Sequence, residues 1–260
     1  MASNTRFVRS ADGVNVAYDA TGTGPALVLL HGGFVQDRRS WHEAGYVEWL
    51  RDQYQVITID IRGHGESDKP IAKEAYEISR LIDDVCAVTD ACGVDRFLLW
   101  GFSFGGTVVL ELAARSHRVK GAVVAGSFFG PTFSEEQLSS TIALMSRASV
   151  AKSEGRLDEL PLSAEHRSFI EQADLNVAIA ASRAMAQWPV LEPGDLLCPA
   201  YVFAGSANVV ATAALEKRKQ SIAAAGIQLH IFDGFEHMQE FTEIETVLPP
   251  ARSFLCGLEG

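Results

Sequence analysis

The chain has 260 residues, of which 47% are hydrophobic and 21% charged, a composition typical of a folded chain with a sizeable core. Asp and Glu outnumber Lys and Arg by 33 to 22, which gives a formal charge of −11 and argues against a nucleic-acid partner, because such binding depends on clustered cations. No apolar run approaches the roughly 20 residues that span a bilayer, and the first residues lack a signal-peptide pattern. We therefore expect a cytoplasmic protein without a membrane partner, and the sequence carries no signal for an oligomeric state.

Strand and helix patterns alternate along the chain. A hairpin is predicted first, around an Asp-Gly turn, and amphipathic helical patterns later separate short runs rich in Val, Ile and Leu. Such runs are typical of strands buried on both faces, so the pattern predicts an α/β fold with a mostly parallel, eight-stranded sheet. The predicted strands are residues 7–9, 14–18, 26–30, 55–59, 96–100, 119–125, 200–204 and 228–232, and the helices are 78–88, 107–114, 212–225 and 242–255. Pro249 and Pro250 mark a kink or a late start in the last helix.

One interval breaks this alternation. Residues 131–189 are helical in pattern and contain no strand candidate, which is too long for a single crossover. We interpret the interval as an inserted helical cap, or lid, with residues 1–130 and 190–260 forming the core.

Neither the cysteines nor any nucleotide motif indicates a bound cofactor. The four cysteines form no C-x-x-C pair, so we expect buried free thiols rather than disulfides or metal ligands. The chain has no G-x-x-x-x-G-K, no H-E-x-x-H and no dinucleotide fingerprint, so no metal, nucleotide or flavin is implied.

The strongest chemical motif follows the predicted strand 96–100. Residues 101–106 have the sequence G-F-S-F-G-G, and a helical pattern begins directly after them. This is a nucleophile elbow, in which Gly101 and Gly105 allow a sharp turn that exposes the hydroxyl of Ser103 at a helix N-terminus. A glycine-rich helix start with a capping serine is the alternative.

A second glycine-rich segment follows the predicted strand 26–30. His31 and Gly32 precede Gly33 and Phe34 at the point where an oxyanion-hole loop should lie. We expect the backbone N–H of Phe104 and that of Gly33 or Phe34 to converge on the developing oxyanion.

With residues 60–67, D-I-R-G-H-G-E-S, a third motif is present, and the chain now resembles the α/β-hydrolase superfamily with a helical cap over nearly its whole length. The resemblance implies an α/β-hydrolase fold and a structural turn braced by Asp60 and Arg62, so His64 is not assigned to catalysis. It also implies a general base on the loop after the last strand, where His237 stands.

The resemblance further implies an acid on the loop after the strand 200–204, but that position holds Asn208. No Asp or Glu occurs between Asp195 and Glu216, and the loop after the strand 119–125 contains none either. An asparagine can orient an imidazole but cannot stabilise its positive charge. The triad is therefore weakened, by nature or by deliberate replacement of an Asp. The alternatives are an acid from elsewhere, such as Glu135 or Glu136, and a Ser–His pair or a protein that binds without turnover.

A serine rather than an aspartate at the elbow argues against epoxide hydrolase and haloalkane dehalogenase chemistry, which uses a carboxylate. We expect a hydrolase of a small carboxylic ester or lactone, in which Ser103 attacks, His237 is base and then acid, and Asn208 orients His237. Cleavage of a carbon–carbon bond, perhydrolysis and non-catalytic ligand binding are the alternatives. The candidate pocket walls, which are apolar residues near the elbow, are Trp41, Phe102, Phe128, Phe129, Trp188 and Met238.

Overall fold

The computed structural model describes residues 5–258, with the backbone alone for residues 164–166. Eight strands form one sheet: β1 (Arg6–Arg9), β2 (Asn15–Thr21), β3 (Ala26–Leu30), β4 (Gln55–Ile59), β5 (Phe97–Phe102), β6 (Val119–Ala125), β7 (Ala200–Gly205) and β8 (Gln228–Phe232). Their order is β1-β2-β4-β3-β5-β6-β7-β8. β2 pairs antiparallel with β1 and β4, whereas every other neighbouring pair is parallel, which confirms the predicted α/β fold.

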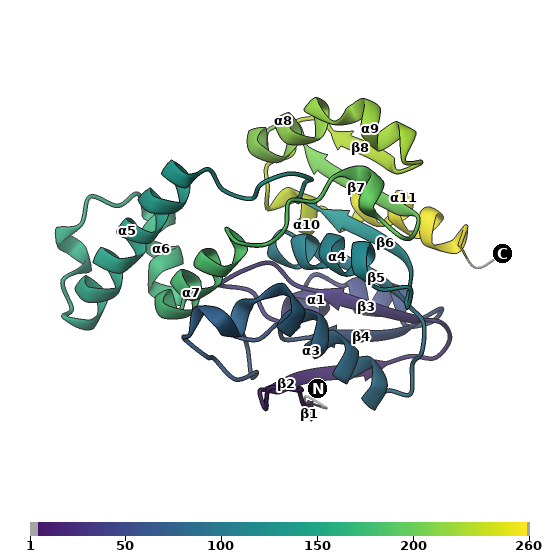
Figure 1. Cartoon of the computed structure of the whole chain (residues 1–260), viewed down its shortest axis with the longest axis horizontal. Helices are drawn as coiled ribbons and strands as arrows, with labels where there is room; N and C mark the ends of the chain where they lie inside the picture. Colours follow the sequence, from purple (N-terminus) through teal and green to yellow (C-terminus); the bar gives the residue numbers. More distant parts are fainter. Residues whose placement is uncertain (1–4, 259–260) are drawn as a thin grey trace.

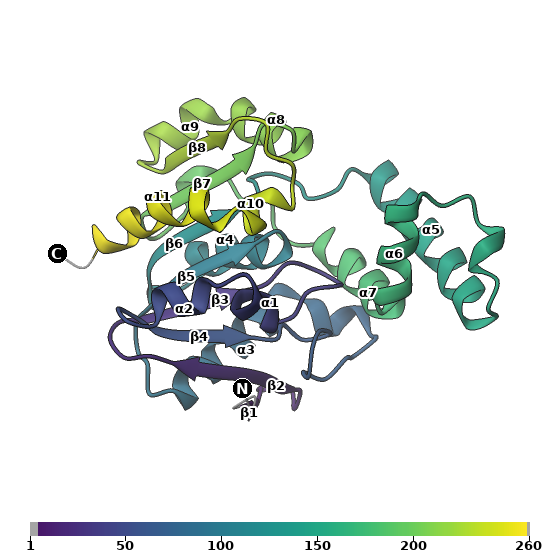
Figure 2. The ribbon, with the colours of Figure 1, turned by 180° about the vertical axis from the view of Figure 1, so that it is seen from behind.

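Helices lie on both faces of the sheet (Figures 1 and 2). The α-helices in the described residues are α1 (Arg39–Glu43), α2 (Tyr46–Leu50), α3 (Ile78–Ala91), α4 (Phe104–Arg115), α5 (Glu135–Ser153), α6 (Ala164–Gln172), α7 (Leu175–Met185), α8 (Val209–Lys217), α9 (Lys219–Ala224), α10 (Gln239–Thr242) and α11 (Ile244–Cys256). Where one helix was expected over 212–225, α8 and α9 meet at Arg218, and α11 runs through Pro249 and Pro250. Within residues 5–258 no helix is long and apolar enough to cross a membrane.

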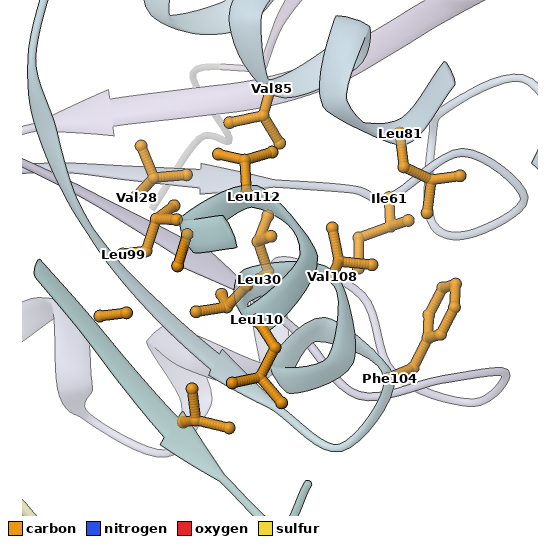
Figure 3. Close-up of a cluster of buried hydrophobic side chains, with 14 of the residues drawn as sticks. Val28, Leu30, Ile61, Leu81, Val85, Leu99, Phe104, Val108, Leu110 and Leu112 are labelled. Carbon is orange, nitrogen blue, oxygen red and sulfur yellow. The ribbon is translucent and has the colours of Figure 1, made fainter. Parts of the chain in front are cut away.

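The sheet is buried on both sides because alternate strand residues point to opposite faces. Val28 and Leu30 of β3 belong to a cluster that includes side chains from α3 and α4, and Figure 3 shows them beside Leu112 of α4. Leu27 and Leu29 belong to a second cluster that contains side chains from α1, α2 and α11. The apolar runs therefore form central strands, as expected. The cysteines are free, but they are not fully buried, and Cys256 is exposed.

The segment from β6 to β7 contains α5, α6 and α7 and, in its described residues, no strand. Ser134 caps α5 by accepting the Gln137 N–H, and Asp174 caps α7 in the same way. α5 and α6 lie to one side of the sheet, whereas α7 returns towards α3 and the core (Figures 1 and 2). This segment has an apolar cluster of its own, built from Ala148, Ile170, Ala173 and Leu175.

The parallel strands β5, β6, β7 and β8 are neighbours, so their carboxyl ends lie along one edge of the sheet. Loops that follow adjacent parallel strands meet at that edge, which is where open α/β sheets bind ligands. The loops after these four strands carry Ser103, Gly126, Asn208 and His237.

Candidate active site

Ser103 lies in the turn between β5 and α4, with φ 53° and ψ −115°. A positive φ is unusual for a residue with a side chain and persists only where the surroundings enforce it. The glycines on either side permit this turn: a Cβ at Gly101 would lie 2.3 Å from the Gly105 carbonyl oxygen, and one at Gly105 would lie 2.2 Å from the Leu30 oxygen. The strand, the turn and the helix thus fix the direction of the Ser103 side chain.

His237 follows β8 and precedes α10, and its imidazole faces the elbow. The Ser103 Oγ lies 2.9 Å from His237 Nε2, within hydrogen-bond distance. The imidazole stacks on the Phe102 ring, with 4.8 Å between ring centroids, and its side chain is 41% exposed. The structure thus brings together the two residues that the sequence assigns as nucleophile and base.

Asn208 lies at the N-terminus of α8, in the short loop after β7. Its Oδ1 accepts the Ala211 N–H at 3.4 Å, and its Nδ2 is 3.0 Å from His237 Nδ1. The same Nδ2 donates to Glu240 Oε1 at 2.9 Å. Asn208 therefore has two roles in the structure, as a helix cap and as a donor to a carboxylate.

Glu240 was not among the residues predicted from the sequence, yet its carboxylate lies beside His237 Nδ1. Its Oε2 lies 2.9 Å from His237 Nδ1, and its Oε1 accepts the Gly205 N–H at 2.7 Å. The side chain is fully buried. A carboxylate therefore contacts His237 from a position that the sequence prediction did not name, whereas the two alternatives that it did name, Glu135 and Glu136, are exposed on α5. The available signal was the spacing, because residues three apart in a helical turn lie on one face.

Space for this carboxylate comes from Gly126, the first residue after β6. Its φ is +63°, and a Cβ there would lie 2.2 Å from Glu240 Oε2 and 2.9 Å from His237 Cε1. Any side chain at this position would displace the Glu240 carboxylate or the imidazole of His237. The loops after β6, β7 and β8 therefore meet around one histidine.

The two candidate oxyanion donors after β3 differ in their partners. The Phe34 N–H donates to His64 Nε2 at 2.8 Å, so the structure removes Phe34 from the expected pair. Gly33 lies against the elbow, since a Cβ on it would be 3.2 Å from Phe104 Cβ. Within residues 5–258 neither the Gly33 nor the Phe104 N–H donates a hydrogen bond. Both N–H groups are therefore free to bind an oxyanion.

Two buried imidazoles hold the loop of Gly33. His31 Nε2 accepts the Ile61 N–H at 3.0 Å, and His31 Nδ1 lies 2.7 Å from the Gly32 oxygen. His64 Nδ1 faces the Ile61 and Arg62 carbonyl oxygens. Burial lowers the pKa of His31 to about 4 and that of His64 to about 3, so both are neutral near pH 7. They are supports for the loop, as the sequence indicated for His64.

A family model for the alpha/beta hydrolase fold matches residues 25–189, which is more than half of the chain. This chain belongs to the α/β-hydrolase fold family. Among curated proteins, epoxide hydrolase 4 of Mus musculus is 34% identical over 109 residues, 41% of this chain and 30% of that protein. The match therefore spans about a third of the length of that relative.

Two solved structures illustrate the likeness over the whole fold. A thermophilic esterase from Thermogutta terrifontis superimposes with a TM-score of 0.77 at 24% identity, over 99% of this chain and 100% of that one. Est816, described as an N-acyl homoserine lactone degrading enzyme, gives a TM-score of 0.70 at 28% identity, over 96% and 100% of the two chains. The first likeness shows the fold alone.

In this α/β hydrolase the turn of residues 60–67 is held by buried charges. Asp60 forms an ion pair with Arg38 and accepts the Glu66 N–H at 2.7 Å. Arg62 forms ion pairs of 2.7 Å with both Asp12 and Asp84. Removing one partner of a buried pair such as Arg62–Asp84 is strongly destabilising, so the turn is a structural brace.

The six predicted pocket walls separate into different environments. Trp41 and Phe129 are fully buried in the two core clusters, which corrects their assignment to the pocket. Phe102 lies under the imidazole of His237, and Trp188 stacks on Phe104 with 6.2 Å between ring centroids. Met238 is 50% exposed beside the base, and Phe128 lines a small cavity with Trp188.

Proposed function

We propose that this α/β hydrolase is a serine hydrolase that cleaves a small carboxylic ester or lactone through an acyl-enzyme on Ser103. The observation that carries the proposal is the 2.9 Å contact between Ser103 Oγ and His237 Nε2 at a strained elbow. A hydroxyl becomes a nucleophile when a base within hydrogen-bond distance takes its proton.

The proposed reaction has two halves. His237 Nε2 takes the proton of Ser103, whose Oγ attacks the carbonyl carbon, while the N–H groups of Gly33 and Phe104 bind the oxyanion. The tetrahedral intermediate then expels the alkoxide, which leaves with the proton from Nε2. Water repeats these steps on the acyl-enzyme and releases the acid. For a lactone, the leaving oxygen stays on the acyl chain and the product is a hydroxy acid.

The nucleophile separates this proposal from the activity named for the epoxide hydrolase relatives. Attack of a serine oxygen on an epoxide carbon would form an ether, which water does not readily cleave, so turnover would stop after one event. Attack on a carbonyl forms an ester, which water cleaves with the same base. The esterase and lactone-degrading neighbours are consistent with acyl chemistry on this fold, so we favour an ester or lactone substrate.

We also propose that residues 131–189 shield the acyl group as a lid. Phe34, beside the candidate oxyanion donors, packs against the apolar cluster of α5–α7 and meets Phe169 of α6 edge to face at 6.0 Å. Trp188 reaches the elbow from the returning end of the same segment. Apolar walls on this side favour an apolar or aromatic acyl group.

The test is a stopped-flow assay with p-nitrophenyl butyrate, followed by mass analysis of the acylated chain. We expect a burst of one p-nitrophenol per chain and the butyryl mass on the peptide that contains Ser103. A fluorophosphonate should block the burst by labelling the same residue. Absence of both the burst and the label in the folded protein would refute the serine hydrolase.

A further inference from the structure

We propose that Glu240 is the carboxylate that orients His237 and stabilises its charged form, and that Asn208 serves Glu240 rather than His237. This inference rests on the proposed function, because it assigns the third member of the same site. It places the acid three residues after the base, in the first turn of α10, instead of on the loop after β7.

The tautomer of His237 decides which neighbour can be its partner. For Nε2 to accept the Ser103 proton, the ring proton must be on Nδ1, so Nδ1 needs an acceptor. Glu240 Oε2 at 2.9 Å is an acceptor. The Asn208 Nδ2 at 3.0 Å is a donor and cannot fill this role.

The amide of Asn208 is held in this orientation by both of its ends. Its Nδ2 donates to Glu240 Oε1 at 2.9 Å, while its Oδ1 accepts the Ala211 N–H at the start of α8. A flipped amide would place Oδ1 against the carboxylate oxygen and Nδ2 against the N–H, which loses both hydrogen bonds. Asn208 therefore cannot offer its oxygen to His237 without breaking the cap and the contact with Glu240.

Two hydrogen-bond donors contact the Glu240 carboxylate, and within the described residues no Lys or Arg pairs with it. Gly205 N–H and Asn208 Nδ2 both bond to Oε1, which leaves Oε2 to the imidazole. A buried carboxylate without a permanent cation gains most when its neighbour is positive, as His237 is after it takes the serine proton. Among described residues, Glu240 is the only acidic side chain that pairs with His237.

The space around His237 fits this placement. Gly126 stands after β6 and Asn208 after β7, so neither loop presents an acid, and the absent side chain of Gly126 is what admits Glu240 Oε2. The carboxylate thus reaches Nδ1 from the chain segment of the histidine itself.

The test compares Glu240→Gln, Asn208→Asp and the double variant Asn208→Asp/Glu240→Gln, assayed with p-nitrophenyl butyrate over a range of pH. Loss of the corresponding acid lowers kcat by about 10⁴-fold in a serine protease, and we expect Glu240→Gln to lower kcat by about 10²-fold to 10⁴-fold with KM little changed. The acid limb of the kcat/KM profile should move to lower pH, because the imidazolium loses its anionic neighbour. A purely structural role for Glu240 would not move that limb.

The change Asn208→Asp should lower kcat if Glu240 is the acid and raise kcat if position 208 is the acid. If Glu240 is the acid, a second carboxylate beside it forces one of the pair to take up a proton, and kcat should fall about tenfold. If Asn208 is a weakened triad member, the same change should raise kcat. In the double variant the charge is moved to position 208, and we expect recovery of most of the activity lost in Glu240→Gln.

The result that overturns the proposal is a Glu240→Gln variant whose kcat and pH profile match those of the unaltered chain. If Glu240→Gln does not fold, an increase of kcat in Asn208→Asp is by itself enough to overturn the proposal. Failure of the proposed function is distinguishable, because then the unaltered chain itself gives no burst and no label on Ser103.

Discussion

The two sides of the candidate active site are held in place in different ways. Ser103 is positioned within one short segment, where β5, the turn and α4 fix its backbone conformation. His237 is positioned by contacts between loops, through Glu240, Asn208 and the stacked ring of Phe102. The nucleophile side therefore depends on backbone sterics, whereas the base side depends on side-chain partners and on the space left by Gly126.

Removing the hydroxyl of Ser103, the proposed nucleophile, should have the largest effect. Ser103→Ala keeps a Cβ in the same backbone conformation, so stability should change little, but no oxygen remains to form the acyl-enzyme. We expect kcat for p-nitrophenyl butyrate to fall about 10⁶-fold, as for the nucleophile of subtilisin. The exposed serine of α9 provides the matched control, Ser221→Ala, which should keep full activity. A tenfold or smaller loss in Ser103→Ala would contradict the assignment.

Gly126→Ala should break the base side while leaving the elbow intact. The new methyl would lie 2.2 Å from Glu240 Oε2, in addition to the strain of φ +63°. We expect kcat to fall about 10²-fold, because the ring of His237 loses its orientation. The measurement is kcat together with the rate of fluorophosphonate labelling, which should fall in parallel.

Gly93→Ala is the control for backbone strain alone. Gly93 has φ +70°, but nothing lies within 4 Å of a Cβ there. It should lose about 1–2 kcal/mol of stability in urea unfolding and keep its kcat. Equal kcat losses in the two glycine variants would mean that strain, and not the lost space, disturbs the site.

Lowering the pH should decrease the free energy of unfolding, because the buried His31 and His64 that hold the loop of Gly33 are neutral in the folded chain. Because burial lowers the pKa of His64 to about 3 from 6.5, the unfolded chain binds a proton between these values and the folded chain does not. Stability is therefore lost as the pH falls below 6.5, by about 1.4 kcal/mol per pH unit for one such group. His64→Gln keeps an acceptor for the Phe34 N–H but cannot titrate.

The measurement is the free energy of unfolding in urea at pH 6.5 and pH 5. We expect the drop between them to be smaller by about 2 kcal/mol in His64→Gln than in the unaltered chain. His117→Gln, at an exposed histidine, should leave the drop unchanged. If the free energy of unfolding falls equally in His64→Gln and in the unaltered chain, then His64 does not cause the loss of stability in acid.

The elements that the sequence predicted well are those with local causes. Strands buried on both faces produce apolar runs, and the elbow needs small residues at fixed spacing around Ser103, so both are visible along the chain. Glu240 was missed because its contact with His237 follows from where α10 begins and from the missing side chain of Gly126. The three-residue spacing of His237 and Glu240 is visible in the sequence, but it does not show that the carboxylate turns toward the imidazole or that Gly126 leaves room for it.

The aromatic and oxyanion assignments show the same limit. Trp41 and Phe129 are apolar residues that a pocket and a core use equally, and only the packing places them in the core. Phe34 loses its N–H to His64, thirty residues away along the chain. The competing acceptor could be found only once the two loops were placed together.

The smallest expected effect tests the contact between the proposed lid and the loop of Gly33. Phe169→Ala removes an edge-to-face contact with Phe34, at 6.0 Å between ring centroids, and such pairs contribute about 0.5–1.5 kcal/mol. We expect kcat/KM for p-nitrophenyl butyrate to fall about twofold to tenfold, with Val150→Ala on the exposed face of α5 as a control without effect. A double-mutant cycle with Phe34→Ala measures the coupling directly, since independent residues would give additive losses. Additive losses would mean that the proposed lid and the loop of Gly33 act independently. A coupling near 1 kcal/mol would mean that the proposed lid supports this loop together with His31 and His64.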